Sequence, residues 1–515
     1  MRSFRNNKVF FSAFIISFGV FLSRITGLFR DIIFASFLGT GIVAEAFYIS
    51  FRLPNTFRRI FAEGAFSNAF VPIFSSKVKE NRLDANSFSS KVFIILLVFL
   101  AVLTVFMEIF MPKVISIINP GFLLDKEKFS LAIFLSRITF PYIILISITA
   151  FFGSILNSIN LFWPFSIISV ILNVVLIFGL IFARNIFSNS GECLAYFAIF
   201  AGVLQLIFVG FFCIKNKVFP SFKMKNINEY NENEDKEDIK LLIKKFIPAV
   251  ISSGILQINI FIDGIFASFF PGAISYLYYT DRIGQFPLSM IGYSLSVAIL
   301  PSLSIAFKEE KYFEILSLQK KSLNIAMFFS IPAMLLIYEL SKNIISFVYE
   351  RGAFTDKDTI IVAKMLSIYA ISIPFNVMLK IFFSCFYAQK DTKTPMKISV
   401  FSLLFNVILN LIIINFIGMY CVVASTTLSS ILSCILAIFF LKKNNIFYLK
   451  IRDLFFSLRV LFISVLTCFI ALLLRDKVQL LLLLIIVGCF YMICCFLIKI
   501  LSINDIKKIN LYFKK

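Results

Sequence analysis

The sequence predicts an all-α, polytopic membrane protein with about fourteen transmembrane helices. Hydrophobic residues make up 60% of the 515 residues and charged residues only 15%. The mean hydropathy is +0.94. Apolar runs of about 20 residues, the length that crosses a bilayer as a helix, recur along the whole chain. A soluble domain of this size carries far more charge.

The fourteen predicted spans follow one another with short connections. We place them at 9–36, 41–62, 90–111, 128–157, 163–183, 193–214, 244–269, 275–305, 322–349, 359–388, 396–415, 419–441, 456–474 and 478–500. The N-terminal sequence MRSFRNNK resembles the start of a signal peptide, but no small-residue cleavage site follows it. We therefore interpret the first apolar run as a retained membrane helix.

The positive charges of the loops orient the chain. With both termini in the cytoplasm, the inner segments and the span ends beside them hold 34 of the 50 Lys and Arg residues, and the outer loops hold 8. Cytoplasmic loops of membrane proteins carry such an excess. The net charge of +22 thus reflects topology and contact with membrane lipids, and we expect no nucleic-acid partner.

An internal repeat divides the chain. The segment DIIFASF at 31–37 matches DGIFASF at 263–269 at six of seven positions. Six spans separate the copies, so both have the same orientation, as in the parallel repeats of some transporters. We predict an N-terminal six-helix lobe (1–215), a cytoplasmic linker (216–243), a C-terminal six-helix lobe (244–441), and two additional helices with a cytoplasmic tail (442–515).

Charged residues concentrate in the first two apolar segments, between Ser23 and Pro72. Each charge at the bilayer midplane costs roughly 2.5–3.5 kcal/mol, so such residues usually line a hydrated cavity. A second group lies in the sequence YYTDRIGQFP. The candidate substrate-binding residues are Arg24, Arg30, Asp31, Glu45, Arg52, Arg58, Arg59, Asp281, Arg282 and Gln285.

The excess of basic groups favours an anionic ligand. Guanidinium groups bind phosphate oxygens bidentately, so Arg30, Arg58 and Arg282 are a candidate triad for a diphosphate. The alternative is structural ion pairing within the membrane, for example of Arg24 with Asp31 or Glu45. We expect Pro54 to break or kink the second helix, because it removes a backbone donor.

Metal and catalytic motifs are weak or absent in the sequence. The chain has no His, which removes His-based catalysis and His metal ligands. Asn259, Asp263, Asp391 and Asn406 are candidate oxygen ligands for a monovalent cation, and helix–helix hydrogen bonding is the alternative role. We find no phosphate-binding Gly-rich loop and no nucleophile motif. We therefore expect no enzyme activity and no cofactor, with Na+ or the membrane potential as candidate driving forces.

Several segments together resemble one family. SRITGLFRDIIFASFLGTG, FRLPNTFRRIFAEGAFSNAFVPIF, LYYTDRIGQFP, ILPSLS and FYAQKDTKTPMKIS are similar to the MurJ/MviN family of lipid II flippases, within the multidrug/oligosaccharidyl-lipid/polysaccharide exporter superfamily. The resemblance runs from the first helix to about residue 441. It implies fourteen helices, two lobes around a cationic cavity, a groove for a lipid tail beside the last two helices, and alternating access.

The resemblance also assigns residues. It places the family's important arginines on Arg24, Arg30, Arg58 and Arg282, with Asp31 as the acidic partner. This chain departs from the pattern at Glu45, where relatives have Asp. It departs again three residues after the Asp281–Arg282 pair, where some relatives have Glu and this chain has Gln. A carboxylate role at that position is therefore in doubt.

The resemblance implies a flippase that moves lipid II, the undecaprenyl-pyrophosphate-linked peptidoglycan precursor, from the inner to the outer leaflet of the bacterial inner membrane. The expected partners are lipid II, membrane lipids and cell-wall synthesis proteins. Three alternatives stay open. They are a cation-coupled exporter of small molecules or other lipid-linked oligosaccharides, a membrane enzyme that processes polyprenyl phosphates, and a scaffold without transport activity.

Overall fold

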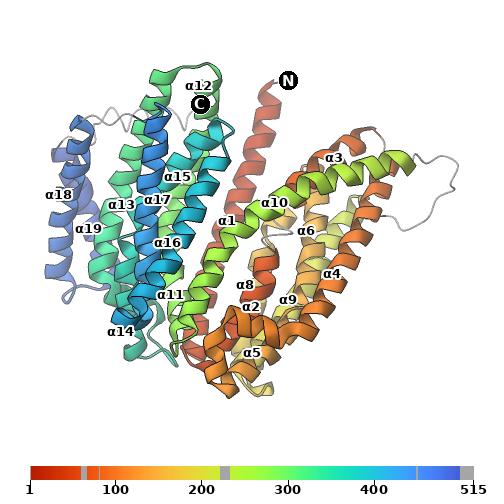
Figure 1. The fold of residues 1–515 in the computed structure, drawn as a ribbon, viewed down its shortest axis with the longest axis horizontal. Helices are drawn as coiled ribbons and strands as arrows, with labels where there is room; N and C mark the ends of the chain where they lie inside the picture. Colours follow the sequence, from red (N-terminus) through yellow and green to blue (C-terminus); the bar gives the residue numbers. More distant parts are fainter. Residues whose placement is uncertain (1, 59–65, 81, 221–231, 448–450, 499–515) are drawn as a thin grey trace. The chain divides into compact units, whose positions relative to one another are not determined.

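The computed structural model describes residues 2–58, 66–80, 82–220, 232–447 and 451–498, which form helices joined by short connections (Figure 1). The chain divides into two compact units. Unit 1 comprises Met1–Ser275 with Arg351–Phe354, and unit 2 comprises Tyr276–Glu350 with Thr355–Lys515.

Unit 1 contains ten α-helices and the start of an eleventh. They are α1 (Arg2–Leu38), α2 (Ile42–Arg58), α3 (Phe66–Glu80), α4 (Arg82–Ile118), α5 (Lys126–Thr139), α6 (Tyr142–Ser158), α7 (Trp163–Ser166), α8 (Ile168–Phe178), α9 (Ser190–Lys215) and α10 (Glu232–Ala267). Three short turns join them: η2 (Pro120–Leu124), η3 (Gly179–Ala183) and η4 (Arg184–Ile186). The first turn of α11 (Ala273–Pro287) also belongs to this unit.

Unit 2 contains the rest of α11 and eight further α-helices. They are α12 (Ser294–Lys308), α13 (Tyr312–Tyr349), α14 (Asp356–Ala370), α15 (Ile373–Ala388), α16 (Lys393–Ile417), α17 (Cys421–Lys443), α18 (Ile451–Leu474) and α19 (Leu480–Leu497). A π-helical segment, η6 (Leu288–Tyr293), continues α11 into α12, and η7 (Gly418–Tyr420) joins α16 to α17.

The predicted membrane fold is confirmed. Each of the fourteen predicted spans falls on one helix or on consecutive helices. Within the described residues, nine stretches are long and apolar enough to cross a membrane, and ten if the α14–α15 pair, bent by 43°, counts as one span. One of the nine, Lys393–Lys443, holds both α16 and α17, so it provides two crossings.

The second predicted span is the least accurate. We expected a helix at 41–62 that breaks or kinks at Pro54. The helix is not broken at Pro54: α2 continues to Arg58, and a further helix, α3, runs from Phe66 to Glu80. A proline in a helix loses one backbone hydrogen bond, and packing of the surrounding residues offsets that loss. Leu53 and Pro54 are both buried.

The internal repeat is confirmed in the local backbone and side-chain structure. In unit 1, Ser67 on α3 hydrogen-bonds Ser154 on α6, with 2.7 Å between the hydroxyl oxygens. In unit 2, Ser296 on α12 makes the same contact with Ser384 on α15 at 2.9 Å. Positive φ angles recur about 230 residues apart as well, in the pairs Gly39/Gly272, Asn160/Lys390 and Lys217/Asn445. Asn160, Lys390, Lys217 and Asn445 each lie two residues after the end of a helix, and Gly39 and Gly272 lie in the connections that lead into α2 and α11.

Aromatic packing forms the core of unit 1. Phe70 lies 5.1 Å from Phe74, 5.9 Å from Phe88 and 5.3 Å from Phe151, measured between ring centroids. These rings come from α3, α4 and α6, so they join three helices. The core of unit 2 gathers aliphatic and aromatic residues of α12, α15 and α17, among them Leu303, Phe386 and Leu441.

The turn between α4 and α5 is held against α10. The backbone N–H of Gly121 donates to Ser268 Oγ at 2.9 Å, and Asn119 Nδ2 donates to the carbonyl of Gly264 at 3.2 Å. A Cβ atom on Gly121 would lie 2.2 Å from the backbone oxygen of Ser268. Glycine is therefore required here for close approach of two backbones.

We predict that Gly121→Ala destabilises the protein, because the new Cβ forces η2 away from α10. Overpacking of this kind costs about 1–3 kcal/mol. The measurement is thermal unfolding of the purified protein in detergent. Gly41→Ala is the control, since a Cβ there meets nothing within 4 Å. Equal unfolding temperatures for the two variants would contradict the required contact.

Candidate functional site

A buried ion pair lies on α1. Arg30 donates from Nη2 and Nε to Asp31 Oδ1, at 2.7 and 3.1 Å. Arg30 is 7% exposed and Asp31 3% exposed. The Arg30 guanidinium also lies over the Phe34 ring, 5.3 Å from its centroid. Adjacent residues thus combine to hold one guanidinium inside an apolar helix bundle.

Asn173 on α8 connects this pair to the preceding turns of α1. Its Oδ1 accepts from Arg30 Nη1 at 3.0 Å. Its Nδ2 donates to the carbonyl of Ser23 at 3.2 Å and to Thr26 Oγ1 at 3.1 Å. The amide therefore fixes both the guanidinium and the turn of α1 around Gly27. The sequence showed Asn173 only as a repeated position, with no indication of this role.

A second buried ion pair joins α2, α5 and the first turn of α11. Glu45 Oε2 lies 2.5 Å from Lys128 Nζ, and Glu45 Oε1 accepts from the backbone N–H of Ile274 at 3.1 Å. The Lys128 ammonium also lies 4.1 Å from the centroid of the Phe122 ring. Both charged residues are buried. This carboxylate therefore fastens three helices at their ends.

Lys128 is a residue that the sequence did not reveal. We expected Glu45 either to bind substrate or to pair with Arg24. Lys128 lies in the charged sequence DKEK, which has the pattern of a solvated loop. Its burial depends on how α5 packs against α2, and no local signal reports that packing.

The spacing of Glu45, Arg52 and Arg59 in the sequence predicts a charged stripe on the second helix. Arg52 Nη1 would lie 3.1 Å from a Cβ placed on Gly264, so Gly264 provides room for this guanidinium beside α10. Arg59 lies outside the described residues.

Arg58 lies at the end of α2. Its Nε donates to Asn55 Oδ1 at 3.3 Å. Arg58 also lines a small cavity of about 60 Å³ together with residues of α6, α7 and α8, including Ile146, Phe165 and Ile168. Arg24, on α1, is exposed.

The predicted residues of unit 2 lie together on α11. Asp281, Arg282 and Gln285 are all exposed. Arg282 Nη2 lies 3.3 Å from the Tyr278 hydroxyl, and its guanidinium lies over the Tyr278 ring at 4.8 Å. Arg30 and Arg58 belong to unit 1 and Arg282 to unit 2, so the convergence of the three on one diphosphate stays a prediction.

The four candidate cation ligands are spread over three parts of the chain. Asn259 and Asp263 are on α10 of unit 1, and Asn406 is on α16 of unit 2. Asp391 precedes α16, and its Oδ1 accepts from the backbone N–H groups of Lys393 and Thr394 at 2.9 and 3.0 Å. Partial burial acts to raise the pKa of Asp391, but the hydrogen bonds from Thr394 and Lys393 outweigh burial and lower it.

Asn406 belongs to a polar cluster between α16 and α17. Its Nδ2 donates to Thr426 Oγ1 at 3.2 Å, and its Oδ1 accepts from Asn410 Nδ2 at 2.9 Å. Within the described part of the chain, Asn410 Oδ1 is buried without a hydrogen-bond partner.

No group of three or more Asp, Glu, His or Cys residues close enough to hold a metal occurs among the described residues. The available donors are therefore neutral oxygens, which suit a weakly charged cation.

We predict that Glu45→Gln lowers stability by about 3–5 kcal/mol, because it leaves the Lys128 ammonium buried without its anion. Adding Lys128→Met to that variant restores most of the loss, since the buried charge is then gone. The measurement is a double-mutant cycle on unfolding in detergent. Lys126→Gln, at an exposed position of the same turn, is the control. Additive losses from the two single changes would show that the pair is not coupled.

Known proteins share this architecture. The family model for the lipid II flippase MurJ matches residues 34–491. The probable lipid II flippase MurJ of Rickettsia prowazekii (strain Madrid E) is 42% identical over 410 residues, covering 79% of this chain and 78% of the relative. That of Rhizobium tropici is 36% identical over 401 residues, covering 76% and 73%.

Comparison with solved structures also finds a lipid II flippase MurJ. A structure titled "Lipid II flippase MurJ, inward closed conformation" matches with a TM-score of 0.79 and 28% identity, covering 93% of this chain and 98% of that one. An inward-facing multidrug resistance transporter of the MATE family matches with a TM-score of 0.67 and 13% identity, covering 82% and 94%, which shows a shared fold. From the family model and the relatives together, this chain belongs to the lipid II flippase MurJ family.

Proposed function

We propose that this protein translocates lipid II from the inner to the outer leaflet of the bacterial inner membrane, by alternating access, and catalyses no bond-making reaction. The observation that carries the proposal is the buried Arg30, fixed by Asp31 and Asn173 within an apolar helix. Membership of the lipid II flippase family supports the choice of cargo.

Arginine suits a diphosphate-linked cargo. A guanidinium offers several N–H donors in a plane and matches two phosphate oxygens at once. A polar head group cannot cross hydrocarbon without replacing its hydration. In this proposal, Arg30, Arg58 and Arg282 supply that replacement, while the polyprenyl tail stays in the lipid.

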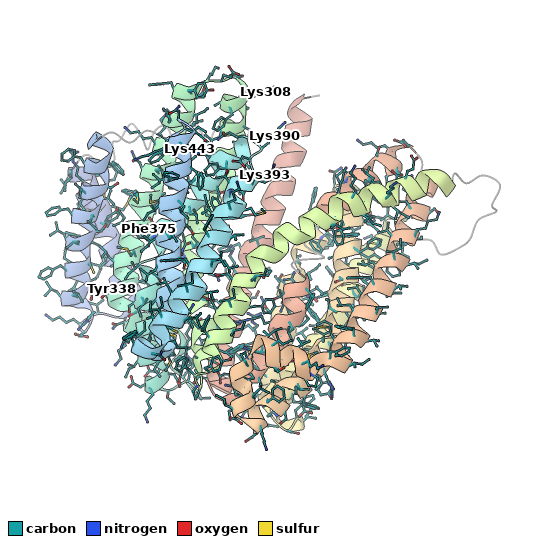
Figure 2. The ribbon with its side chains drawn as sticks, in the orientation of Figure 1. Lys308, Tyr338, Phe375, Lys390, Lys393 and Lys443 are labelled. Carbon is teal, nitrogen blue, oxygen red and sulfur yellow. The ribbon has the colours of Figure 1, made fainter. Side chains whose placement is uncertain are left out.

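The distribution of lysines supports cytoplasmic termini. Figure 2 shows Lys308, Lys390, Lys393 and Lys443 at one end of unit 2. They lie at the ends of α12, α15, α16 and α17, the ends that the loop charges place in the cytoplasm. Both termini are then cytoplasmic, and the cargo is delivered to the outer leaflet, where cell-wall synthesis proteins that use it are the expected partners.

We expect the arginine variants to lower translocation in cells depleted of the native protein. Hydrogen bonds to charged groups contribute about 1.5–3 kcal/mol, so Arg30→Ala, Arg58→Ala or Arg282→Ala lowers the flux about tenfold or more. Arg30→Lys retains the charge but loses the bidentate fork, and it falls between wild type and Arg30→Ala. The measurement is the amount of lipid-linked precursor accessible at the outer leaflet.

Arg475→Gln is the control for these variants, because Arg475 lies in an exposed turn beside Asp476. Membrane insertion is measured for every variant, so that loss of folding is separated from loss of flux. An unchanged outer-leaflet pool after depletion of the protein would refute the proposed function. Normal flux in all three alanine variants would refute only the arginine assignment.

We further propose that an ion gradient or the membrane potential drives the cycle. The unsatisfied Asn410 Oδ1 beside Asn406 and Thr426 supports a monovalent cation at this cluster. Asp391 precedes α16 and lies roughly 20 Å along the chain from Asn406 at 1.5 Å per residue, so it does not share this cluster. Asn259 and Asp263 stay candidate cation ligands of unit 1. Neutral oxygens bind such an ion weakly enough for release.

We predict that an inward Na+ gradient accelerates transport of a lipid II analogue in proteoliposomes and that Asn406→Leu abolishes this acceleration. Ser402→Ala, on the same helix, is the control. A matched K+ gradient with valinomycin sets the potential separately. Equal rates under every gradient in the wild-type protein would contradict the cation proposal, while a response to potential alone would assign the driving force to voltage.

A further inference from the structure

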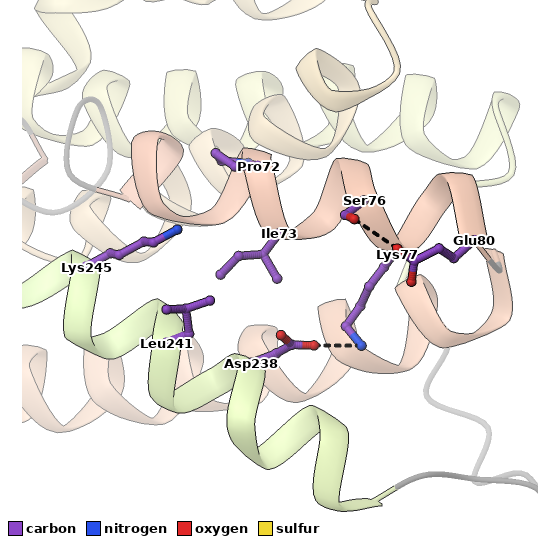
Figure 3. A pocket seen from close by; sticks show the side chains of 8 residues that line it. All are labelled: Pro72, Ile73, Ser76, Lys77, Glu80, Asp238, Leu241 and Lys245. Carbon is purple, nitrogen blue, oxygen red and sulfur yellow. Dashed lines mark hydrogen bonds and ion pairs between the residues drawn. The ribbon is translucent and has the colours of Figure 1, made fainter.

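Unit 1 has a second cavity, whose lining includes none of the arginines on α1 and α2. It lies between α3 and the N-terminal part of α10 and has a volume of about 350 Å³ (Figure 3). That volume is within the range of small-molecule sites. Neither the proposed transport mechanism nor the cation proposal uses it.

The cavity lies where both helices change from apolar to polar sequence. On α3, the apolar run FVPIF ends at Phe74 and is followed by SSKVKE. On α10, the charged start ends at Lys245 and is followed by the apolar FIPAVI. Pro72, Ile73 and Leu241 form its apolar wall. A boundary of this kind on two neighbouring membrane helices marks the level of lipid head groups.

A salt bridge, which we call the clamp, crosses the cavity between α3 and α10. Lys77 Nζ on α3 lies 2.8 Å from Asp238 Oδ2 on α10, and the two side chains are 7% and 24% exposed. The Lys77 ammonium also lies 5.7 Å from the centroid of the Phe88 ring on α4. This pair holds three helices together and neutralises its own charges.

Two further charges stand at opposite ends of the cavity. Lys245 extends into its apolar end beside Pro72, and Glu80 lies at its polar end (Figure 3). Glu80 Oε1 accepts from Ser76 Oγ at 3.0 Å. Within the described residues, neither Lys245 nor Glu80 forms an ion pair. The cavity therefore presents one cation near the apolar wall and one carboxylate further out.

We propose that this cavity binds the head group of a phospholipid that carries both a phosphate and a primary ammonium, of the phosphoethanolamine type. In such a lipid, the phosphate lies next to the acyl chains and the ammonium lies at the outer end. Lys245 then contacts the phosphate, the Glu80 carboxylate, which already accepts from Ser76 Oγ, accepts from the ammonium, and the first carbons of the chains meet Ile73 and Leu241.

The charge order argues against other head groups. A head group with only negative charge would lie against the carboxylate of Glu80, and like charges repel at this range. A quaternary ammonium lacks N–H donors for Glu80. This inference does not depend on the cargo that the protein transports.

The test is native mass spectrometry of the full-length protein in detergent, with dioleoyl phosphatidylethanolamine, phosphatidylglycerol or phosphatidylcholine at equal concentrations. We expect preferential retention of phosphatidylethanolamine by the wild-type protein. A lysine near the membrane surface contributes about 1 kcal/mol of attraction to lipid phosphate, so Lys245→Gln weakens retention about fivefold. Lys244→Gln is the matched control, because Lys244 is the exposed neighbour outside the cavity lining.

The variant Glu80→Gln provides an independent test of the predicted ammonium contact. It lowers retention of phosphatidylethanolamine and raises that of phosphatidylglycerol, since it removes a negative charge. The double variant Lys245→Glu with Glu80→Lys keeps the same two residue types but exchanges their positions. We expect it to bind phosphatidylethanolamine no better than the single variants. Soluble phosphoethanolamine at millimolar concentration separates the two sources of this chemistry, and we expect it to compete poorly because it has no chains.

Three results would overturn the proposal. One is equal retention of phosphatidylethanolamine by Lys245→Gln and Lys244→Gln. Another is preferential retention of phosphatidylglycerol by the wild-type protein in a manner that depends on Lys245. The third is full competition by soluble phosphoethanolamine, which would assign the cavity to a water-soluble phosphate ester instead of a lipid.

Discussion

The structure depends on a single constraint: charged side chains inside apolar helices must be held by other polar groups. Arg30 shows how the chain meets it. Its guanidinium contacts a carboxylate on the next residue and an amide on another helix, so burial does not leave the charge isolated. Removing water from an arginine is costly, and the cost is tolerated when the pair has a function. A guanidinium fixed in position can bind an incoming phosphate without first being ordered, which favours binding.

Ion pairs with different partners serve different purposes in this protein. The Glu45–Lys128 pair is buried and also accepts a backbone N–H, so its donors and acceptors are engaged within the protein and it acts as a structural fastening. The Lys77–Asp238 pair joins α3 to α10 and leaves Lys245 and Glu80 on either side of it for a ligand. The same residue types thus hold helices together in one place and line a cavity in another, according to the partners that the fold gives them.

The internal repeat explains why the two units share local features while differing in chemistry. The Ser67–Ser154 and Ser296–Ser384 contacts preserve one helix–helix packing in both units. Hydroxyl pairs of this kind stabilise helix contacts in lipid, where hydrophobic association is weak. Asn173 and Asn406 occupy repeated positions, but the first contacts an arginine and the second contacts a threonine and an asparagine. The repeated scaffold therefore holds a buried guanidinium in one unit and a cluster of neutral polar groups in the other.

The sequence alone determined the all-α membrane fold, the internal repeat and the concentration of charge near Arg30, because hydropathy and the cost of a buried charge are properties of local sequence. The sequence could not determine which residues contact one another in the folded protein. Pairing of Glu45 with Lys128, the contact of Asn173 with Arg30, the extension of the second span into α3, and the cavity beside Lys245 all depend on which helices pack together. Residues distant in sequence meet only through that packing, so only the tertiary structure could decide these contacts.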